Sequence, residues 1–216
     1  MHWTAHVRFG DGVCRAVRRV GERVDEGLVV RAQGGDRDAF EQIVNVSFDR
    51  SHGVAMRLLR DSQLAEDAVQ QAMVNVWRDL PRLRDPARYD AWSYKLLVRA
   101  CYAEYKRAPR WMPAIEEGSP TEPRTGDQYG VVMDRDQLER GFRRLSMDHR
   151  AVIVLHHYLD QPLDEVGRIM GIPTGTVKSR LHRALAEMRA ALEADARPAG
   201  ASESAAEPAA SGEVAS

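Results

Sequence analysis

Residues 163–184 carry the side chains whose types and spacing point most directly to a chemical task. The segment reads LDEVGRIMGIPTGTVKSRLHRA, and its second half gathers hydroxyl and guanidinium groups on one side of an expected helix. Hydroxyl and guanidinium groups near a helix N-terminus suit the edges of DNA bases, and flanking cations suit phosphates. The residues that we expect to face DNA are Thr174, Thr176, Lys178, Ser179, Arg180, His182 and Arg183.

Two helices joined by a glycine turn must position these side chains. Gly171 stands where the first helix must end, Pro173 blocks its continuation, and Thr174 is placed to cap the second helix. The apolar residues expected inside are Leu163, Val166, Ile169 and Met170, then Val177, Leu181, Ala184, Leu185 and Met188. This order predicts a helix-turn-helix, which places its second helix in the DNA major groove. The alternative is an ordinary amphipathic helix at a domain surface.

A second candidate surface lies on the helix expected over residues 88–108. Its apolar arc is expected to hold Tyr94, Leu97, Val98, Cys101 and Tyr105. The opposite side carries Lys95, Arg99, Tyr102 and Lys106, and Arg107 extends its positive end. A row of cations with an aromatic ring among them suits an unpaired strand, because cations follow phosphates and a ring stacks on an exposed base. A solvated face with one incidental tyrosine is the alternative.

The helix expected over residues 64–83 has a different outer face. Its core stripe is expected to be Val69, Ala72, Met73, Val76, Trp77 and Leu80. The opposite side carries Asp67, Gln70, Gln71, Val74 and Arg78. The apolar Val74 among polar groups indicates a protein-docking patch, although single exposed apolar residues are common.

The spacing of apolar residues predicts an all-α chain with two small helical domains joined by a flexible linker. Helices are expected at 25–33, 36–60, 64–83 and 88–108, with Asp36 capping the second. Residues 111–133 are rich in proline and glycine and form the expected linker, after which helical pattern continues through 134–192. Residues 1–24 are expected to be a weakly ordered extension, and residues 193–216 a disordered acidic Ala/Ser/Pro tail.

Composition limits the classes of protein that the chain could be. The formal net charge of the 216 residues is −1, but acids concentrate in the tail while the expected DNA-facing helices are basic. Two cysteines, Cys14 and Cys101, make neither a disulfide framework nor a zinc site, and Cys101 is expected in the core. No apolar run reaches the length of a membrane span, and the first residues do not carry the apolar region expected of a signal peptide. We therefore expect a soluble, cytoplasmic protein with no metal and no cofactor.

With these motifs in order, the chain resembles the extracytoplasmic-function (ECF) sigma factors of the sigma-70 family. Residues 28–40 are similar to the opening of the family's region 2, and residues 66–77 to its segment that grips the polymerase clamp. Residues 91–107 resemble the segment that melts and holds the −10 promoter element. Residues 175–184 resemble the region 4 helix that reads the −35 element. The chain departs from the family's usual pattern at Gln71, Ala100 and Glu104, and it has Leu145-Ser146 where Leu-Pro is usual.

The resemblance implies a function for each surface. It places a region 2 domain at 25–110 and a region 4 helix-turn-helix domain at 134–192. The set from Thr174 to Arg183 would read the −35 element, and the cations and tyrosine of 88–108 would hold the opened −10 strand. Asp67, Gln70, Gln71, Val74 and Arg78 would contact the clamp region of the largest polymerase subunit. The implied partners are RNA polymerase core, promoter DNA and an anti-sigma factor, and the protein would not be an enzyme.

The sequence leaves three other classes of protein as alternatives. A conventional helix-turn-helix regulator, which binds an operator without joining polymerase, is the main alternative, but it does not account for the face expected on 88–108. An enzyme has little support, because His149, His156 and His157 lack a cysteine or carboxylate at metal-ligand spacing. A scaffold or anti-sigma-like module does not account for two basic helical faces.

Overall fold

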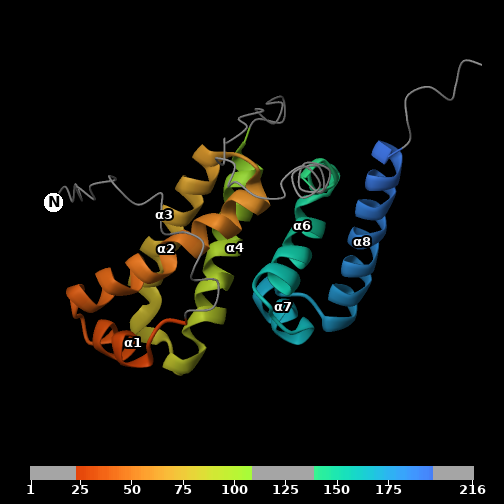
Figure 1. The fold of residues 1–216 in the computed structure, drawn as a ribbon. Helices are drawn as coiled ribbons and strands as arrows, with labels where there is room; N and C mark the ends of the chain where they lie inside the picture. The colour runs from red at the N-terminus through yellow and green to blue at the C-terminus, as the bar shows by residue number, and fades with distance from the viewer. Residues whose placement is uncertain (1–22, 109–138, 197–216) are drawn as a thin grey trace, which may run out of the picture.

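The computed structural model describes residues 23–108 and 139–196, which contain helices and turns and no strand (Figure 1). The first group of elements, which we call the first lobe, comprises α1 (Glu26–Gln33), α2 (Arg37–Leu59), α3 (Ser62–Asp79) and α4 (Tyr89–Arg107). Two 3₁₀ turns, η1 (Leu80–Arg82) and η2 (Pro86–Arg88), lie between α3 and α4. The second lobe comprises a helical segment over 139–144, α6 (Met147–Ile153), a π-helical turn η3 (Val154–Tyr158), α7 (Leu163–Met170) and α8 (Thr174–Ala196).

Side-chain caps begin the helices of the first lobe where the sequence predicts them. Asp25, Asp36 and Asp61 each accept a hydrogen bond from a backbone N–H in the first turn of α1, α2 and α3. Asp36 accepts from Ala39 N at 3.0 Å and also from the Arg31 guanidinium. The Ala39 N–H and Arg31 together hold the pKa of Asp36 below its usual range. The predicted N-cap at Asp36 is therefore confirmed.

Helix bounds agree with the sequence within a few residues, except around the break between α3 and α4. The helix predicted over 64–83 begins at Ser62 and ends at Asp79, because Pro81 cannot continue it and the chain turns into η1. In the second lobe, α8 runs through Ala196 and so passes the predicted end at residue 192. The predicted extension, linker and tail lie largely outside the described residues, as does Cys14.

The turn between α7 and α8 depends on two glycines. Gly171 adopts a left-handed conformation with φ 72°, which ends α7 and which a residue with a Cβ adopts only with strain. A Cβ on Gly167 would stand 2.8 Å from the carbonyl oxygen of Ile172, so only glycine lets the turn pass this close to α7. α8 begins at Thr174, and the Pro173 carbonyl accepts from the Thr176 and Val177 N–H groups. Thr174 is thus the first helical residue rather than the predicted cap.

Ser146 is the second residue of the Leu145-Ser146 pair, which stands where Leu-Pro is usual. Its side chain accepts a hydrogen bond from His149 N at 3.2 Å and so caps α6. A serine cap satisfies one of the free N–H groups at the start of a helix, which proline at the same position would not do through its side chain. α6 therefore begins with a fixed first turn despite the missing proline.

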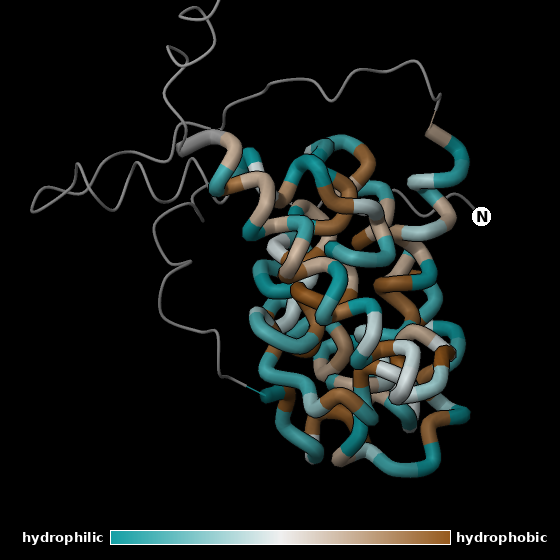
Figure 2. The backbone as a smooth tube through the Cα atoms, turned by 90° about the vertical axis from the view of Figure 1, so that its right-hand side faces the viewer, coloured by the Kyte–Doolittle hydropathy of each residue, from teal (hydrophilic) through white to brown (hydrophobic). Residues whose placement is uncertain are grey.

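The two lobes pack side by side, and α4 lies against the second lobe (Figure 1). Hydrophobic and hydrophilic stretches alternate along the helices (Figure 2). The larger apolar cluster is continuous across both: it joins Val54, Leu58 and Leu97 of the first lobe to Leu155 and Val166 of the second. A smaller cluster around Val29, Ile43 and Tyr89 belongs to the first lobe alone. The lobes therefore share one core in addition to the first lobe's own.

Three residues predicted to lie in the core are partly exposed instead. Trp77 is 39% exposed, Tyr105 47% and Leu185 41%, so these three interior assignments are wrong. Trp77 contacts Phe40, with ring centroids 4.7 Å apart and the rings tilted by 57°, and the remainder of its surface is exposed. Helical spacing alone misplaces such residues because they lie at the edge of an apolar arc, where the neighbouring helix decides burial. Cys101 is fully buried as predicted, and burial raises the pKa of its thiol to about 12.

Candidate nucleic-acid interface

α8 presents a polar and basic face along its first three turns. Val177 and Ala184 are buried and fix the helix on the second lobe, which turns the other side outward. Lys178, Ser179, His182 and Arg183 are exposed, whereas Thr174 and Thr176 are half-buried. Ser179 donates its hydroxyl hydrogen to the Thr176 carbonyl oxygen at 3.0 Å, which leaves its lone pairs free to accept. This face has the donors and charges needed to contact base edges and phosphates.

Arg180 lies on the same helix but is engaged by a carboxylate. Its Nη1 is 3.0 Å from Asp148 Oδ2 of α6, and the Arg180 side chain is 28% exposed. An arginine that reads a base must direct its guanidinium at the groove, so Arg180 could take the predicted role only by exchanging this partner for DNA. Arg180 is therefore held by an ion pair to another helix of the same lobe.

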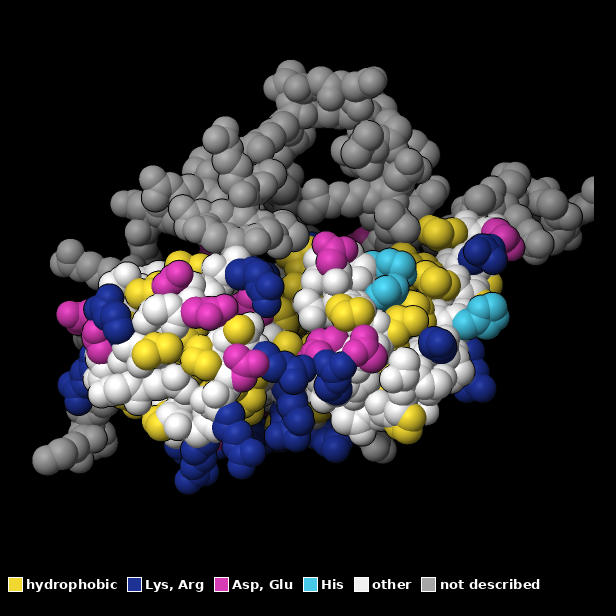
Figure 3. Space-filling model, turned by 90° about the horizontal axis from the view of Figure 1, so that it is seen from below, with side chains coloured by type: hydrophobic (Ala, Val, Ile, Leu, Met, Phe, Trp, Pro, Cys, Tyr) yellow, Lys and Arg dark blue, Asp and Glu magenta, His cyan; other side chains and the backbone are white. Residues whose placement is uncertain are grey.

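α4 presents cations to solvent on the side away from its buried residues. Arg99, Lys106 and Arg107 are exposed and Lys95 is half-buried. Arg107 donates to Glu104 Oε1 at 2.7 Å, so part of its charge is already balanced. Ala100, one residue after Arg99, is buried and offers no group to a base. The space-filling view shows lysine and arginine side chains gathered along one edge of the molecule, with acidic side chains beside them (Figure 3).

Tyr102 is half-buried at the contact between the two lobes. The ring packs against the shared core, and its hydroxyl donates to Asp148 Oδ1 at 2.5 Å. Burial, with the bond to the Asp148 carboxylate, raises the pKa of the Tyr102 hydroxyl above its usual range. The predicted strand-holding set is thus split: Arg99, Lys106 and Arg107 are exposed, while the Tyr102 ring is half-buried and its hydroxyl is bonded to the second lobe.

The outer face of α3 is open along its length. Asp67, Gln70, Gln71 and Arg78 are exposed, and Val74 is 53% exposed. Weak polar contacts run along the helix, from Gln71 to Asn75 at 3.3 Å and from Arg78 to Asp79 at 2.9 Å. Together with the exposed part of Trp77, Val74 forms an apolar strip flanked by polar groups, as at many protein-docking surfaces.

Sequence reasoning missed Asp148 and Gly167. Asp148 lies in the first turn of α6, where an acidic residue is ordinary, and nothing in its neighbours indicates contacts with α4 and α8. Gly167 could have been found, because a glycine inside a short helix next to a turn often marks a close approach of two backbones.

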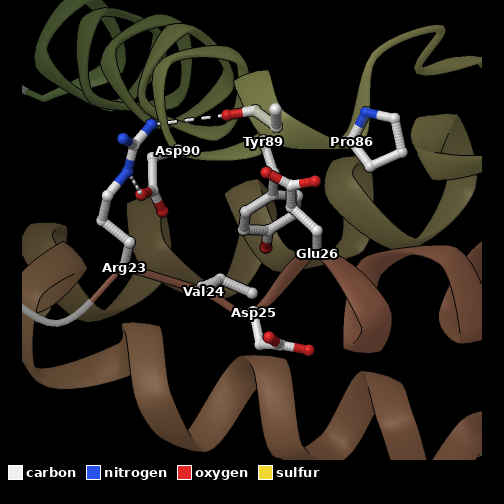
Figure 4. Close-up of a pocket in the computed structure, with 8 residues that line it drawn as sticks. Arg23, Val24, Asp25, Glu26, Pro86, Tyr89 and Asp90 are labelled. Carbon is white, nitrogen blue, oxygen red and sulfur yellow. Dashed lines mark hydrogen bonds and ion pairs between the residues drawn. The ribbon is translucent and has the colours of Figure 1, made fainter.

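A shallow polar hollow of about 490 Å³ lies apart from these faces (Figure 4). It is lined by Asp25, Glu26, Pro86, Tyr89 and neighbouring residues at the starts of α1 and α4. Arg23 crosses it, with Nε 3.4 Å from Asp90 Oδ2 and Nη2 3.4 Å from the Ala87 carbonyl oxygen. None of the predicted site residues lines this hollow, which joins the segment before α1 to the start of α4.

Within residues 23–108 and 139–196 no group of histidine, cysteine and acidic side chains is arranged to hold a metal ion. Among the same residues, no helix has the length and apolarity that crossing a membrane requires. His156 is half-buried with Nδ1 2.8 Å from the Gln161 carbonyl oxygen, and His157 is exposed. His156 is thus part of the packing of its lobe, and His157 lies at the surface.

Two family patterns match the chain. The pattern described as "Sigma-70 region 2" matches residues 48–110, which run from within α2 through α4. The pattern described as "Sigma-70, region 4" matches residues 141–190, which include α6, α7 and most of α8. The two matches thus cover the helices that carry the faces described above.

Curated relatives extend over most of the chain. The ECF RNA polymerase sigma factor SigM of Mycobacterium tuberculosis is 31% identical over 180 residues, which cover 82% of this chain and 90% of SigM. SigL of the same species is 32% identical over 144 residues, covering 64% of this chain and 80% of SigL. SigW of Bacillus subtilis is 26% identical over 176 residues, covering 76% of this chain and 94% of SigW.

Two solved structures share the fold. CnrH, solved with the cytosolic domain of CnrY, superposes with a TM-score of 0.58 at 23% identity, covering 80% of this chain and 99% of that one. RpoE of Bartonella quintana, solved with the anti-sigma factor NepR, gives a TM-score of 0.56 at 22% identity, covering 72% and 98%.

Proposed function

The chain belongs to the extracytoplasmic-function group of the sigma-70 family, and we propose how its surfaces share the work of a sigma factor. A sigma factor joins the RNA polymerase core, directs it to promoters and helps to open the DNA. The two lobes correspond to the region 2 and region 4 matches. We assign them to residues 25–110 and 134–192, with a linker over 111–133.

In this proposal α8 reads the −35 element in the major groove. Arg180 pairs with a base edge, and Thr174, Thr176 and Ser179 supply shorter hydrogen-bonding groups. Lys178, His182 and Arg183 hold the flanking phosphates. The support is the face itself: hydroxyl and guanidinium groups on the outer side of a helix whose inner side is anchored by Val177 and Ala184.

α4 holds the opened −10 strand. Its exposed cations Arg99, Lys106 and Arg107, with Lys95, follow the phosphates, and Tyr102 offers its ring once the second lobe moves away. α3 docks on the clamp region of the largest polymerase subunit through Asp67, Gln70, Gln71, Val74 and Arg78. Neither DNA face is large, so the binding free energy is shared among the three surfaces.

Further features of the proposal follow from family membership. The protein catalyses no reaction itself and works in the cytoplasm with polymerase core, while residues 111–133 run toward the polymerase active-site channel. The two solved relatives were captured with CnrY and with NepR, an anti-sigma factor, and an anti-sigma partner is proposed for this chain as well.

The observation that carries the proposal is the outward basic face of α8 within a sequence that matches region 4. Run-off transcription tests it: the purified chain is added to core polymerase on a library of genomic fragments. We expect transcripts that start downstream of shared −35 and −10 sequences and that are absent with core alone. Operator binding without promoter-specific transcripts would instead identify a conventional helix-turn-helix regulator.

A further inference from the structure

Asp148 of α6 engages Arg180 of α8 by a contact that lies entirely within the second lobe. Arg180 Nη1 is 3.0 Å from Asp148 Oδ2, and the two side chains are 28% and 42% exposed. The other carboxylate oxygen, Oδ1, accepts from the Tyr102 hydroxyl of α4 at 2.5 Å. A displacement of the first lobe would remove the contact with Tyr102 but would leave Asp148 beside Arg180. The ion pair therefore does not depend on where the first lobe lies.

The second lobe itself keeps Asp148 within reach of Arg180. α6 packs directly against α8, and both helices contribute to the larger apolar cluster. Next to Asp148, His149 Nδ1 lies 2.8 Å from Glu187 Oε2, which is further along α8 than Arg180. This contact and the apolar packing fix the position of α6 relative to the helix proposed to enter the major groove. Asp148 is thus available to Arg180 whichever DNA sequence lies in that groove.

A partner of this kind changes how much an unsuitable base costs. Against a base that it fits, Arg180 leaves Asp148 and forms hydrogen bonds with the base edge. Against a base that it does not fit, an arginine with no carboxylate nearby would be left hydrated in the groove, whereas Arg180 can return to Asp148. Hydrogen bonds between a guanidinium and a carboxylate are charge-assisted and stronger than neutral ones. The complex with the unsuitable base therefore loses the base contact but keeps the ion pair.

We propose that Asp148 is a specificity-determining residue, which lowers discrimination at the base that Arg180 reads by offering the arginine an alternative partner. Asp148 also weakens binding to the suitable base, because the ion pair must be broken before that base is contacted. The inference rests on the base-reading role proposed above for Arg180. Promoters that differ at this single position are accordingly bound with more similar affinities than the donors of α8 alone would give.

The test is equilibrium binding of the reconstituted holoenzyme to fluorescent promoter fragments that differ at single −35 positions. Discrimination at each position is the affinity for the preferred base divided by the affinity for the others. We expect Asp148→Asn to raise discrimination about threefold at one position and to leave the other positions unchanged. A ratio is measured because the loss of a negative charge near DNA raises the affinity for every sequence alike. Asp148→Ala, which also removes the amide that could still accept from Arg180, should act in the same direction.

Glu187→Gln is the matched control. It removes another carboxylate that joins α8 to α6, but this carboxylate contacts His149 instead of Arg180. Discrimination should therefore be unchanged at every position. In an Arg180→Ala background, Asp148→Asn should have no position-specific effect, because the arginine that the carboxylate engages is absent.

The outcomes separate the role of Asp148 from that of Arg180. If Arg180→Ala weakens binding to all fragments equally, Arg180 reads no base, and both its proposed role and the inference about Asp148 are overturned. If Arg180→Ala removes discrimination at one position while neither Asp148 variant raises it there, Arg180 keeps its role and Asp148 loses the one proposed here. A rise in Glu187→Gln equal to that in Asp148→Asn would show that the placement of α8, not the ion pair, sets discrimination, which also overturns the inference.

Discussion

At the scale of single residues, exposure separates the predicted DNA contacts into two kinds. Lys178, His182 and Arg183 face solvent and need no rearrangement to contact phosphate. Arg180 and Tyr102 have partners inside the protein and must exchange them. Binding that requires such exchange is weakened by the free energy of the contacts that are broken. Arg180 and Tyr102, which have the most specific proposed roles, are therefore already bonded to another residue of the protein.

The assignment of Arg180 to a base predicts a specific loss. Arg180→Ala should reduce discrimination at one position of the −35 element by about 1–3 kcal/mol and leave the other positions unaffected. The measurement is transcription by reconstituted holoenzyme on a library of promoter variants. Arg189→Ala, an exposed arginine further along α8, is the control. An equal fall on all promoters would make Arg180 a phosphate contact.

At the scale of elements, the helix-turn-helix depends on one backbone approach. Gly167→Ala places a Cβ 2.8 Å from the Ile172 carbonyl oxygen, which cannot move without displacing the turn. We expect a loss of about 1–3 kcal/mol in the free energy of unfolding. Gly175→Ala is the control, because a Cβ there meets open space in α8 and should be neutral or slightly stabilising. Urea unfolding of both variants checks the prediction, and equal stabilities would contradict it.

Among the described residues, none covers the outer face of α3 and buries Val74. Val74→Asp should abolish co-purification with core polymerase and leave the helix content intact, because a charge would be buried at the docked surface. Val30→Asp is the matched control: Val30 is 55% exposed and Val74 53%, but Val30 lies on α1. Co-purification of the Val74 variant at the natural level, with circular dichroism unchanged, would contradict the assignment of this face.

At the scale of the whole molecule, the shared core couples the lobes. Leu155 is fully buried in the second lobe and belongs to the cluster that includes Leu97 of α4. Leu155→Ala should lower the free energy of unfolding by about 2–5 kcal/mol. Because the cluster is continuous, hydrogen exchange should accelerate in α4 as well as in α6. Exchange that accelerates only in the second lobe would show that the lobes unfold independently.

The family could be predicted from the order of its motifs in the sequence. The helices and their outward faces could be predicted because both follow from residues close together in the chain. A cap at Asp36, a left-handed Gly171 and the exposed face of α3 follow from local patterns of three to four residues. The same reasoning failed for Trp77, Tyr105 and Leu185, which lie at the edges of apolar arcs. For those residues a neighbouring helix, not the spacing, sets how much surface is covered.

The sequence by itself determined which side chains could contact DNA and polymerase. Only the tertiary structure decided which of them are free to do so. Tyr102 and Asp148 are 46 positions apart, and their contact exists because a shared apolar core brings α4 beside α6. A local pattern can set the direction of a side chain on its own helix, but its partner in the other lobe is fixed only when the two lobes pack.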